Sequence, residues 1–132
     1  MVTEENNTEE DKDSDNEYKI PEDLEIEYYN RTSKSTWYII RINATGDAIL
    51  ETYLIELKEQ KQYNITHEEL YEIYHEIITN NFFMLNETDS YYDYLLIKAD
   101  GEEHIVKTSG SHSEQIDNIT KKIMALLKSK DN

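Results

Sequence analysis

The sequence predicts an α+β fold, in which an antiparallel sheet of about four strands in ββαββα order carries two helices packed on one face. Two observations lead to this prediction. Strand pairs separated by short turns occur twice, and an amphipathic helical segment follows each pair. Turns of two to five residues join antiparallel strands, whereas parallel strands need a much longer crossover. The pattern therefore favours an α+β fold over a parallel sheet.

The first strand pair is predicted between residues 24 and 57. Residues 24–28 alternate between apolar and polar side chains, which indicates a short edge strand. Residues 36–42 (TWYIIRI) are β-branched and aromatic, with Tyr38, Ile40 and Ile42 on one face. Residues 43–47 (NATGD) predict a turn, and residues 48–57 predict the return strand.

The first helix is predicted to begin after Thr66. Thr66 and Glu69 form a capping box, in which each side chain bonds the other residue's backbone amide. The pair Asn80-Asn81 is expected to end the helix, and residues 82–85 (FFML) to enter the core just after it. An apolar stripe runs along one helix face at positions i, i+3, i+4, i+7 and i+8: Leu70, Ile73, Tyr74, Ile77 and Ile78.

The second half repeats this plan. Residues 91–99 and 102–108 predict two strands joined by the two-residue turn Asp100-Gly101. That turn fixes the register, so that Leu95 faces Val106 on an apolar side and Leu96 faces Ile105 on a wetter side. After residues 109–113 a second helix is expected, with its inward residues Ile116, Ile119, Ile123, Met124, Leu126 and Leu127.

Acidic residues are concentrated at the amino terminus. The chain has 132 residues with 29 acidic and 13 basic side chains, a net charge of -16. Residues 1–23 contain few large aliphatic side chains and predict a disordered acidic arm, since they cannot bury enough apolar surface to offset their ordering entropy. Residues 24–132 are expected to form a single domain. The acidity argues against nucleic acid and against an anionic membrane as partners.

The cellular location depends on what precedes Met1. If an export segment has been removed, the protein is expected to be extracellular or in the cell envelope, and otherwise to be cytoplasmic. Export is favoured by the number of Asn-x-Thr sequons, which are glycosylation sites in exported proteins. Six occur, at Asn6, Asn30, Asn43, Asn64, Asn86 and Asn118.

A hairpin, a helix, the run NNFFML, an acidic turn, an Asp-Gly hairpin and a second helix follow one another over residues 36–128. This order resembles small exported or lipid-anchored bacterial and archaeal domains of unknown function. The resemblance implies an α+β fold and an exported location. It implies no activity.

Candidate catalytic and metal sites are few. The acids Asp11, Asp13, Asp15 and Glu22 have the spacing of a calcium loop, although no amphipathic helix flanks them. The pair Glu72 and His75 is only half of a carboxylate-bridged metal site. Neither a nucleophile motif nor a phosphate-binding loop is found, so we expect no enzyme activity and no cofactor.

Tyrosine is the most informative residue type, since eleven occur in this small chain. Tyrosine provides a large amphipathic contact area at low entropy cost. The wetter side of the second hairpin is therefore a candidate contact surface for an unknown protein or envelope component, through Tyr92, Tyr94, Leu96 and Ile105. The leading prediction is a non-enzymatic extracellular or cell-envelope interaction domain. The alternatives are a small acidic inhibitor or immunity-type protein that binds a basic partner, and a calcium-dependent binding module.

Overall fold

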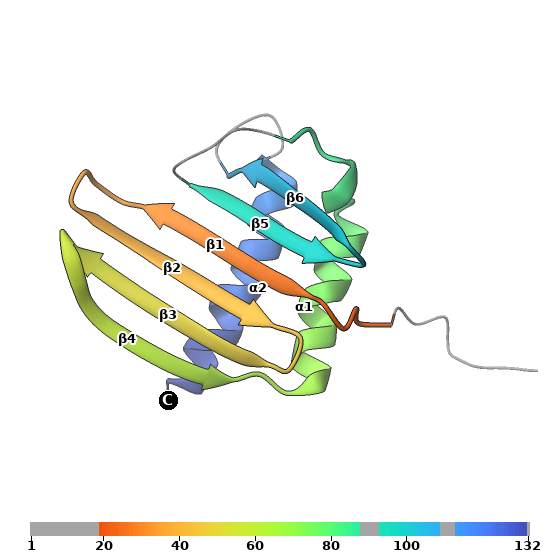
Figure 1. Cartoon of the computed structure of the whole chain (residues 1–132), viewed down its shortest axis with the longest axis horizontal. Coiled ribbons are helices and arrows are strands. Elements are labelled where there is room, and N and C mark those ends of the chain that lie inside the picture. Colours follow the sequence, from red (N-terminus) through yellow and green to blue (C-terminus); the bar gives the residue numbers. More distant parts are fainter. Residues whose placement is uncertain (1–18, 88–92, 109–112, 132) are drawn as a thin grey trace, which may run out of the picture.

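The computed structural model describes residues 19–87, 93–108 and 113–131. A single sheet lies in front of both helices, which pack on the same face (Figure 1). In chain order the elements are β1 (Glu25–Arg31), β2 (Thr36–Asn43), β3 (Asp47–Leu54), β4 (Glu56–Asn64), α1 (His67–Thr79), the short 3-10 helix η3 (Phe82–Met84), β5 (Tyr94–Ala99), β6 (Glu102–Lys107) and α2 (Ser113–Lys130).

The sheet has six antiparallel strands in the order β4-β3-β2-β1-β5-β6. The α+β class is confirmed, but the prediction of about four strands in ββαββα order is wrong. The missed strand is β4, whose residues from Glu56 to Gln62 are almost all exposed, with only Tyr63 buried. An edge strand that is solvent-exposed along most of its length has no apolar alternation, so its sequence resembled a loop.

Strand β1 is central to the sheet, whereas the sequence predicted a short edge strand at residues 24–28. It pairs with β2 on one side and with β5 on the other. Ile26 lies opposite both Ile42 and Ile97, and all three side chains are buried. This strand therefore joins the two hairpins into one sheet, a pairing that no local sequence pattern reports.

The second hairpin and the start of α1 are as predicted. Leu95 lies opposite Val106 and Leu96 opposite Ile105, around the Asp100-Gly101 turn. The Thr66 hydroxyl accepts a hydrogen bond from the Glu69 amide at 3.1 Å, and the Glu69 carboxylate accepts one from the Thr66 amide at 2.9 Å.

The core lies between the sheet and the helices. Its fully buried members include Ile40 and Leu95 from the sheet and Ile73 and Ile119 from the helices. Of the residues expected to enter the core after α1, Phe82 and Leu85 are buried but Met84 is 83% exposed. Met124 is likewise exposed rather than inward on α2. Among the described residues no helix is long and apolar enough to span a membrane.

The segment before β1 contacts the domain. Pro21 is buried, and its carbonyl accepts a hydrogen bond from the Leu24 amide at 3.2 Å. The Asp23 carboxylate accepts hydrogen bonds from the amides of Asp100 and Gly101, each at 2.8 Å. The start of β1 is thereby attached to the β5–β6 turn. Residues 1–18 of the predicted arm lie outside the described residues.

Candidate functional site

The helices cover one face of the sheet, and we call the other the open face. Strand alternation and register assign its residues, most of which are half-buried or exposed. The open face consists of Glu25, Glu27, Tyr29 and Arg31 on β1; Trp37, Ile39, Arg41 and Asn43 on β2; Asp47, Ile49, Glu51 and Tyr53 on β3; Leu57, Gln60, Gln62 and Asn64 on β4; Tyr94, Leu96 and Lys98 on β5; and Glu103, Ile105 and Lys107 on β6.

Two pairs of stacked rings lie on the open face. Trp37 and Tyr53 face each other across β2 and β3, with ring centroids 5.3 Å apart and planes 11° from parallel. Tyr29 and Tyr94 stack across β1 and β5 at 5.4 Å and 15°. The guanidinium of Arg31 lies 5.4 Å from the Trp37 ring centroid, a cation–π distance.

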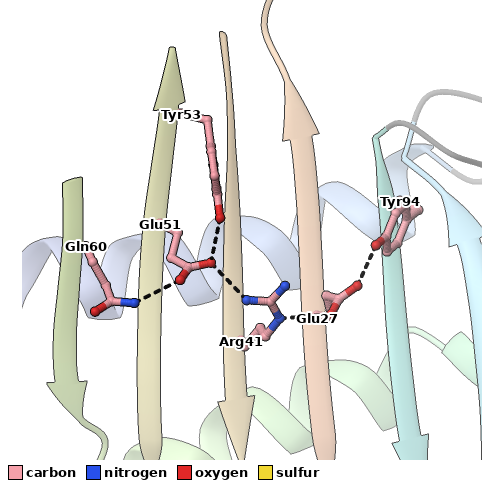
Figure 2. Close-up of polar contacts among 6 residues, drawn as sticks. All are labelled: Glu27, Arg41, Glu51, Tyr53, Gln60 and Tyr94. Atoms are coloured by element: carbon pink, nitrogen blue, oxygen red, sulfur yellow. Dashed lines mark hydrogen bonds and ion pairs between the residues drawn. The ribbon is translucent and has the colours of Figure 1, made fainter. Parts of the chain in front are cut away.

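A continuous polar network connects the two stacks (Figure 2). The Arg41 guanidinium donates from Nε to Glu27 at 3.1 Å and from Nη1 to Glu51 at 3.0 Å. The Tyr94 hydroxyl donates to Glu27. The Tyr53 hydroxyl donates to Glu51 at 3.2 Å, and the Gln60 amide donates to Glu51 at 2.8 Å. Five adjacent strands, from β4 to β5, contribute to this network.

Burial and hydrogen bonds within the network shift the pKa values of several of its groups. Hydrogen bonds from Gln60, and then from Arg41 and Tyr53, lower the pKa of the Glu51 carboxyl. Burial, reinforced by the hydrogen bond to Glu27, raises the pKa of the Tyr94 hydroxyl. Burial and the hydrogen bond to Glu51 likewise raise the pKa of the Tyr53 hydroxyl, so both phenols keep their protons at neutral pH and act as donors. Such bonds fix the rings at the two ends of the network.

A hollow of about 300 Å³ lies on the open face beside the network. Ile49 and Leu96 form apolar walls, and Glu25, Glu27 and Asp47 bring acidic groups to its lining. Arg41 also lines the hollow, but its guanidinium is paired with Glu27 and Glu51.

The open face is nearly neutral although the whole chain has a charge of -16. By the register it carries five acids, namely Glu25, Glu27, Asp47, Glu51 and Glu103, and four bases, namely Arg31, Arg41, Lys98 and Lys107. Most of the surplus acid therefore lies outside this face.

The structure places three of the four predicted contact residues together. Leu96 and Ile105 are half-buried neighbours on the open face, and Tyr94 is in the adjacent row. Tyr92 lies outside the described residues. Tyr29 and Tyr53 belong to the surplus of tyrosines seen in the sequence but were not predicted as contact residues, and neither Trp37 nor the polar network was predicted. Tyr38, Ile40 and Ile42 were predicted to share one face of their strand, so alternation puts Trp37, Ile39 and Arg41 on the other. No local pattern shows which residues of other strands lie beside them.

The other candidate sites are not assembled in the part of the chain that is described. Asp11, Asp13 and Asp15 of the calcium-loop pattern lie outside it, and Glu22 is exposed. Glu72 pairs with Lys122 at 2.9 Å. Nowhere in residues 19–87, 93–108 and 113–131 do three His, Cys, Asp or Glu side chains converge to hold a metal ion.

The asparagines of five of the six sequons fall within the described residues. Asn43, Asn64, Asn86 and Asn118 are exposed, whereas Asn30 is half-buried and donates to the Tyr28 hydroxyl at 2.9 Å. The side-chain oxygen of Asn43 organises the β2–β3 turn, because it accepts from the amides of Thr45 and Asp47. Asn6 lies outside the described residues.

Together these features define a two-layer α+β domain with helices on one sheet face and an aromatic, nearly neutral open face. Comparison with protein-family models, curated protein sequences and solved structures gives no match.

Proposed function

We propose that this protein is a non-enzymatic interaction domain of the cell envelope or extracellular space, and that it binds another protein through its open face. The observation that carries the proposal is the pair of ring stacks, Trp37 on Tyr53 and Tyr29 on Tyr94, held by one polar network on the face without helices. The network carries one net negative charge, from Glu27 and Glu51 against Arg41, but each of these three groups is hydrogen-bonded within it. A partner can therefore cover the network without leaving a charged group that lacks a hydrogen-bonding partner.

The size and composition of the open face support this function. Six strands spaced about 4.8 Å apart, each roughly 20–25 Å long, provide an area on the order of 600 Å². Standard protein interfaces bury about 800 Å² on each partner. Trp, Tyr and Arg are the residues that most often dominate binding energy. Here Trp37 and Arg31 are already in contact, so little side-chain freedom remains to be lost on binding.

The acidic-inhibitor alternative receives less support. An inhibitor steered onto a basic partner is expected to concentrate acids on its contact surface. The open face instead carries nearly equal numbers of acids and bases. Net acidity elsewhere favours solubility and speeds the approach of basic molecules in general, without defining a site.

An extracellular or envelope location is supported by the exposure of the sequons at Asn43, Asn64, Asn86 and Asn118. Export would make these asparagines accessible to glycosyl transfer in an organism that has the machinery. Intact mass measurement of the protein isolated from its native source tests this point. Added hexose mass at one or more sequons is expected, and an unmodified protein recovered from the cytoplasm would contradict the location.

Photo-crosslinking in the cells that make the protein tests the proposed contact. A benzophenone side chain replaces Tyr29 on the open face in one variant. In the control variant it replaces Met84, which is more exposed but lies on η3, away from the open face. The proposal predicts discrete protein adducts from position 29 and not from position 84. Equal adducts from both positions, or adducts from position 84 alone, would contradict it.

A further inference from the structure

The connection between β3 and β4 forms an apolar projection at one end of the sheet. We call Leu54, Ile55 and Leu57 the hairpin tip; they are 49%, 76% and 48% exposed. Only two other large hydrophobic residues within the described ranges are classed as exposed, Met84 and Met124. Strand alternation places Leu57 on the open face and Leu54 on the helix-covered side, with the more exposed Ile55 between them. Large apolar side chains exposed together at one turn, rather than scattered, indicate a contact site.

The hairpin tip is also held in an unfavourable backbone conformation. Ile55 alone connects β3 to β4, and its φ angle is 70°. A β-branched residue rarely adopts this left-handed conformation, which glycine or asparagine would accept at little cost. The Ile55 amide donates to the Ser35 carbonyl at 2.7 Å, so the tip is fixed against the β1–β2 loop. An exposed isoleucine at such a position opposes stability, which indicates that its side chain serves another purpose.

Charged residues of both signs surround the hairpin tip. Lys34 is exposed in the loop to which Ile55 is bonded, and Lys58 is exposed just after Leu57. Arg31 lies at the same end of the sheet, against Trp37. The acids Glu56 and Glu59 are exposed on the same connection, and the Asp93 carboxylate accepts a hydrogen bond from the Arg31 amide. This end therefore combines apolar groups with balanced charges, in a chain whose net charge is -16.

The hollow is complementary to the tip. Its walls, Ile49 and Leu96, are apolar, and Glu25 and Asp47 lie exposed in its lining. A void left by one leucine is on the order of 150 Å³. The hollow, of about 300 Å³, therefore has room for two aliphatic side chains. The hollow lies at the start of β3, and the hairpin tip lies at the end of the same strand. The tip of a chain therefore cannot reach the hollow of that same chain.

We infer that the hairpin tip of one copy inserts into the hollow of a second copy of this chain. This inference rests on the proposed function, because it names the occupant of one part of the open face. The contact is heterologous: each pairing leaves one unused tip and one unused hollow, so further copies can be added in the same direction. Lys34 and Lys58 of one copy would then approach Glu25 and Asp47 of the next.

Sedimentation velocity of the full chain tests the inference over a series of protein concentrations. The runs are made at high ionic strength, which screens the repulsion between copies of charge -16. The wild type should form species larger than a dimer as concentration rises. Ile55→Gly removes the tip side chain and Leu96→Lys blocks the hollow, and each should weaken association by at least about tenfold. Ile49→Lys serves as the hollow variant if Leu96→Lys does not fold.

A mixture of the two variants gives the most specific test of the contact. Ile55→Gly retains its hollow and Leu96→Lys retains its tip, so an equal mixture should form a dimer that does not grow, at concentrations where each variant alone stays monomeric. Asn81→Gly, which relieves another positive φ of 55° at an exposed residue away from the tip, should associate like wild type. A wild type that stays monomeric, or an Ile55→Gly variant that associates like wild type, would overturn the inference. Adducts to a different protein at position 29 in a monomeric chain would leave the proposed function standing while this inference fails.

Discussion

Tyr28 and Tyr29 are adjacent in sequence but lie on opposite faces of the sheet. Tyr28 is 7% exposed and packs edge-on against Tyr38 at 5.8 Å on the helix-covered side. Tyr29 is half-buried on the open face and stacks on Tyr94. The same residue type thus contributes to the core at one position and to the proposed contact surface at the next.

The two tyrosines should differ sharply when each is replaced by serine. Tyr28→Ser removes a core ring and leaves a cavity, so the free energy of unfolding should fall by about 3 kcal/mol or more. Tyr29→Ser removes one ring from an accessible stack, so the loss should be about 1 kcal/mol. Urea denaturation of both variants measures the difference. Equal losses would mean that the open face is packed in the native protein and not available to a partner.

Gly46 should tolerate no side chain. Its φ is 92°, and a Cβ built there would lie 2.1 Å from the carbonyl oxygen of Ile65. The Gly46 carbonyl also accepts a hydrogen bond from the Ile65 amide at 2.7 Å, so the two backbones cannot separate freely. Gly46→Ala should therefore lower the free energy of unfolding by about 2–4 kcal/mol.

Gly101 provides the matched control for Gly46. Its φ is 80°, but nothing lies within 4 Å of an added Cβ. Gly101→Ala should lower the free energy of unfolding only by the backbone strain, about 1 kcal/mol. Thermal melts of the two variants compare the costs, and a Gly101→Ala variant as unstable as Gly46→Ala would show that the close approach to Ile65 is not the cause.

Asp23 should make stability depend on acid. Hydrogen bonds from the Gly101 amide, and then from the Asp100 amide, lower the pKa of its carboxyl below 3.8. Because the folded-state pKa is lowered, the stabilisation is fully present above the unfolded pKa and is lost as pH falls through the folded value. Asp23→Asn should thus melt below wild type at neutral pH, with the gap closing in strong acid. A gap that stays constant on acidification would contradict this role.

Two truncations test where the amino-terminal arm ends. Deletion of residues 1–18 should leave the melting temperature level or slightly higher, because it removes acidic charge and little apolar surface. Deletion of residues 1–23 should lower it, because Pro21 and the Asp23 contacts are then lost. Differential scanning calorimetry compares the two. Equal melting temperatures would mean that the arm ends at residue 23, as predicted from the sequence. A lower melting temperature after the shorter deletion would show that residues 1–18 stabilise the domain.

Local features were predicted well from the sequence. The capping box of Thr66 and Glu69 and the Asp100-Gly101 hairpin each depend on residues within a few positions of one another. The alternation in residues 36–42 also gave the correct faces of β2. Such patterns can be recognised in the sequence because residues a few positions apart determine the local backbone geometry and the face on which each side chain lies.

Features set by distant pairing were not predicted. The sequence of β1 resembles an edge strand because its exposed face carries Glu25, Glu27 and Tyr29, yet it lies between β2 and β5. The polar strand β4 forms because β3 offers an edge to pair with, not because its own residues favour a strand. The polar network joins residues up to 67 positions apart, so it becomes visible only once the strand order is known.

The central claim is that the open face is the contact surface for a protein partner. The photo-crosslinking experiment at position 29 identifies a partner protein. The most direct measurement is the affinity of that purified partner for wild type and variants of this chain, by isothermal titration calorimetry. Trp37→Ala and Tyr29→Ser should each weaken binding by at least about tenfold while Met84→Ala leaves it unchanged. If both open-face variants bind as tightly as wild type, or if Met84→Ala alone weakens binding, the open face is not the contact surface.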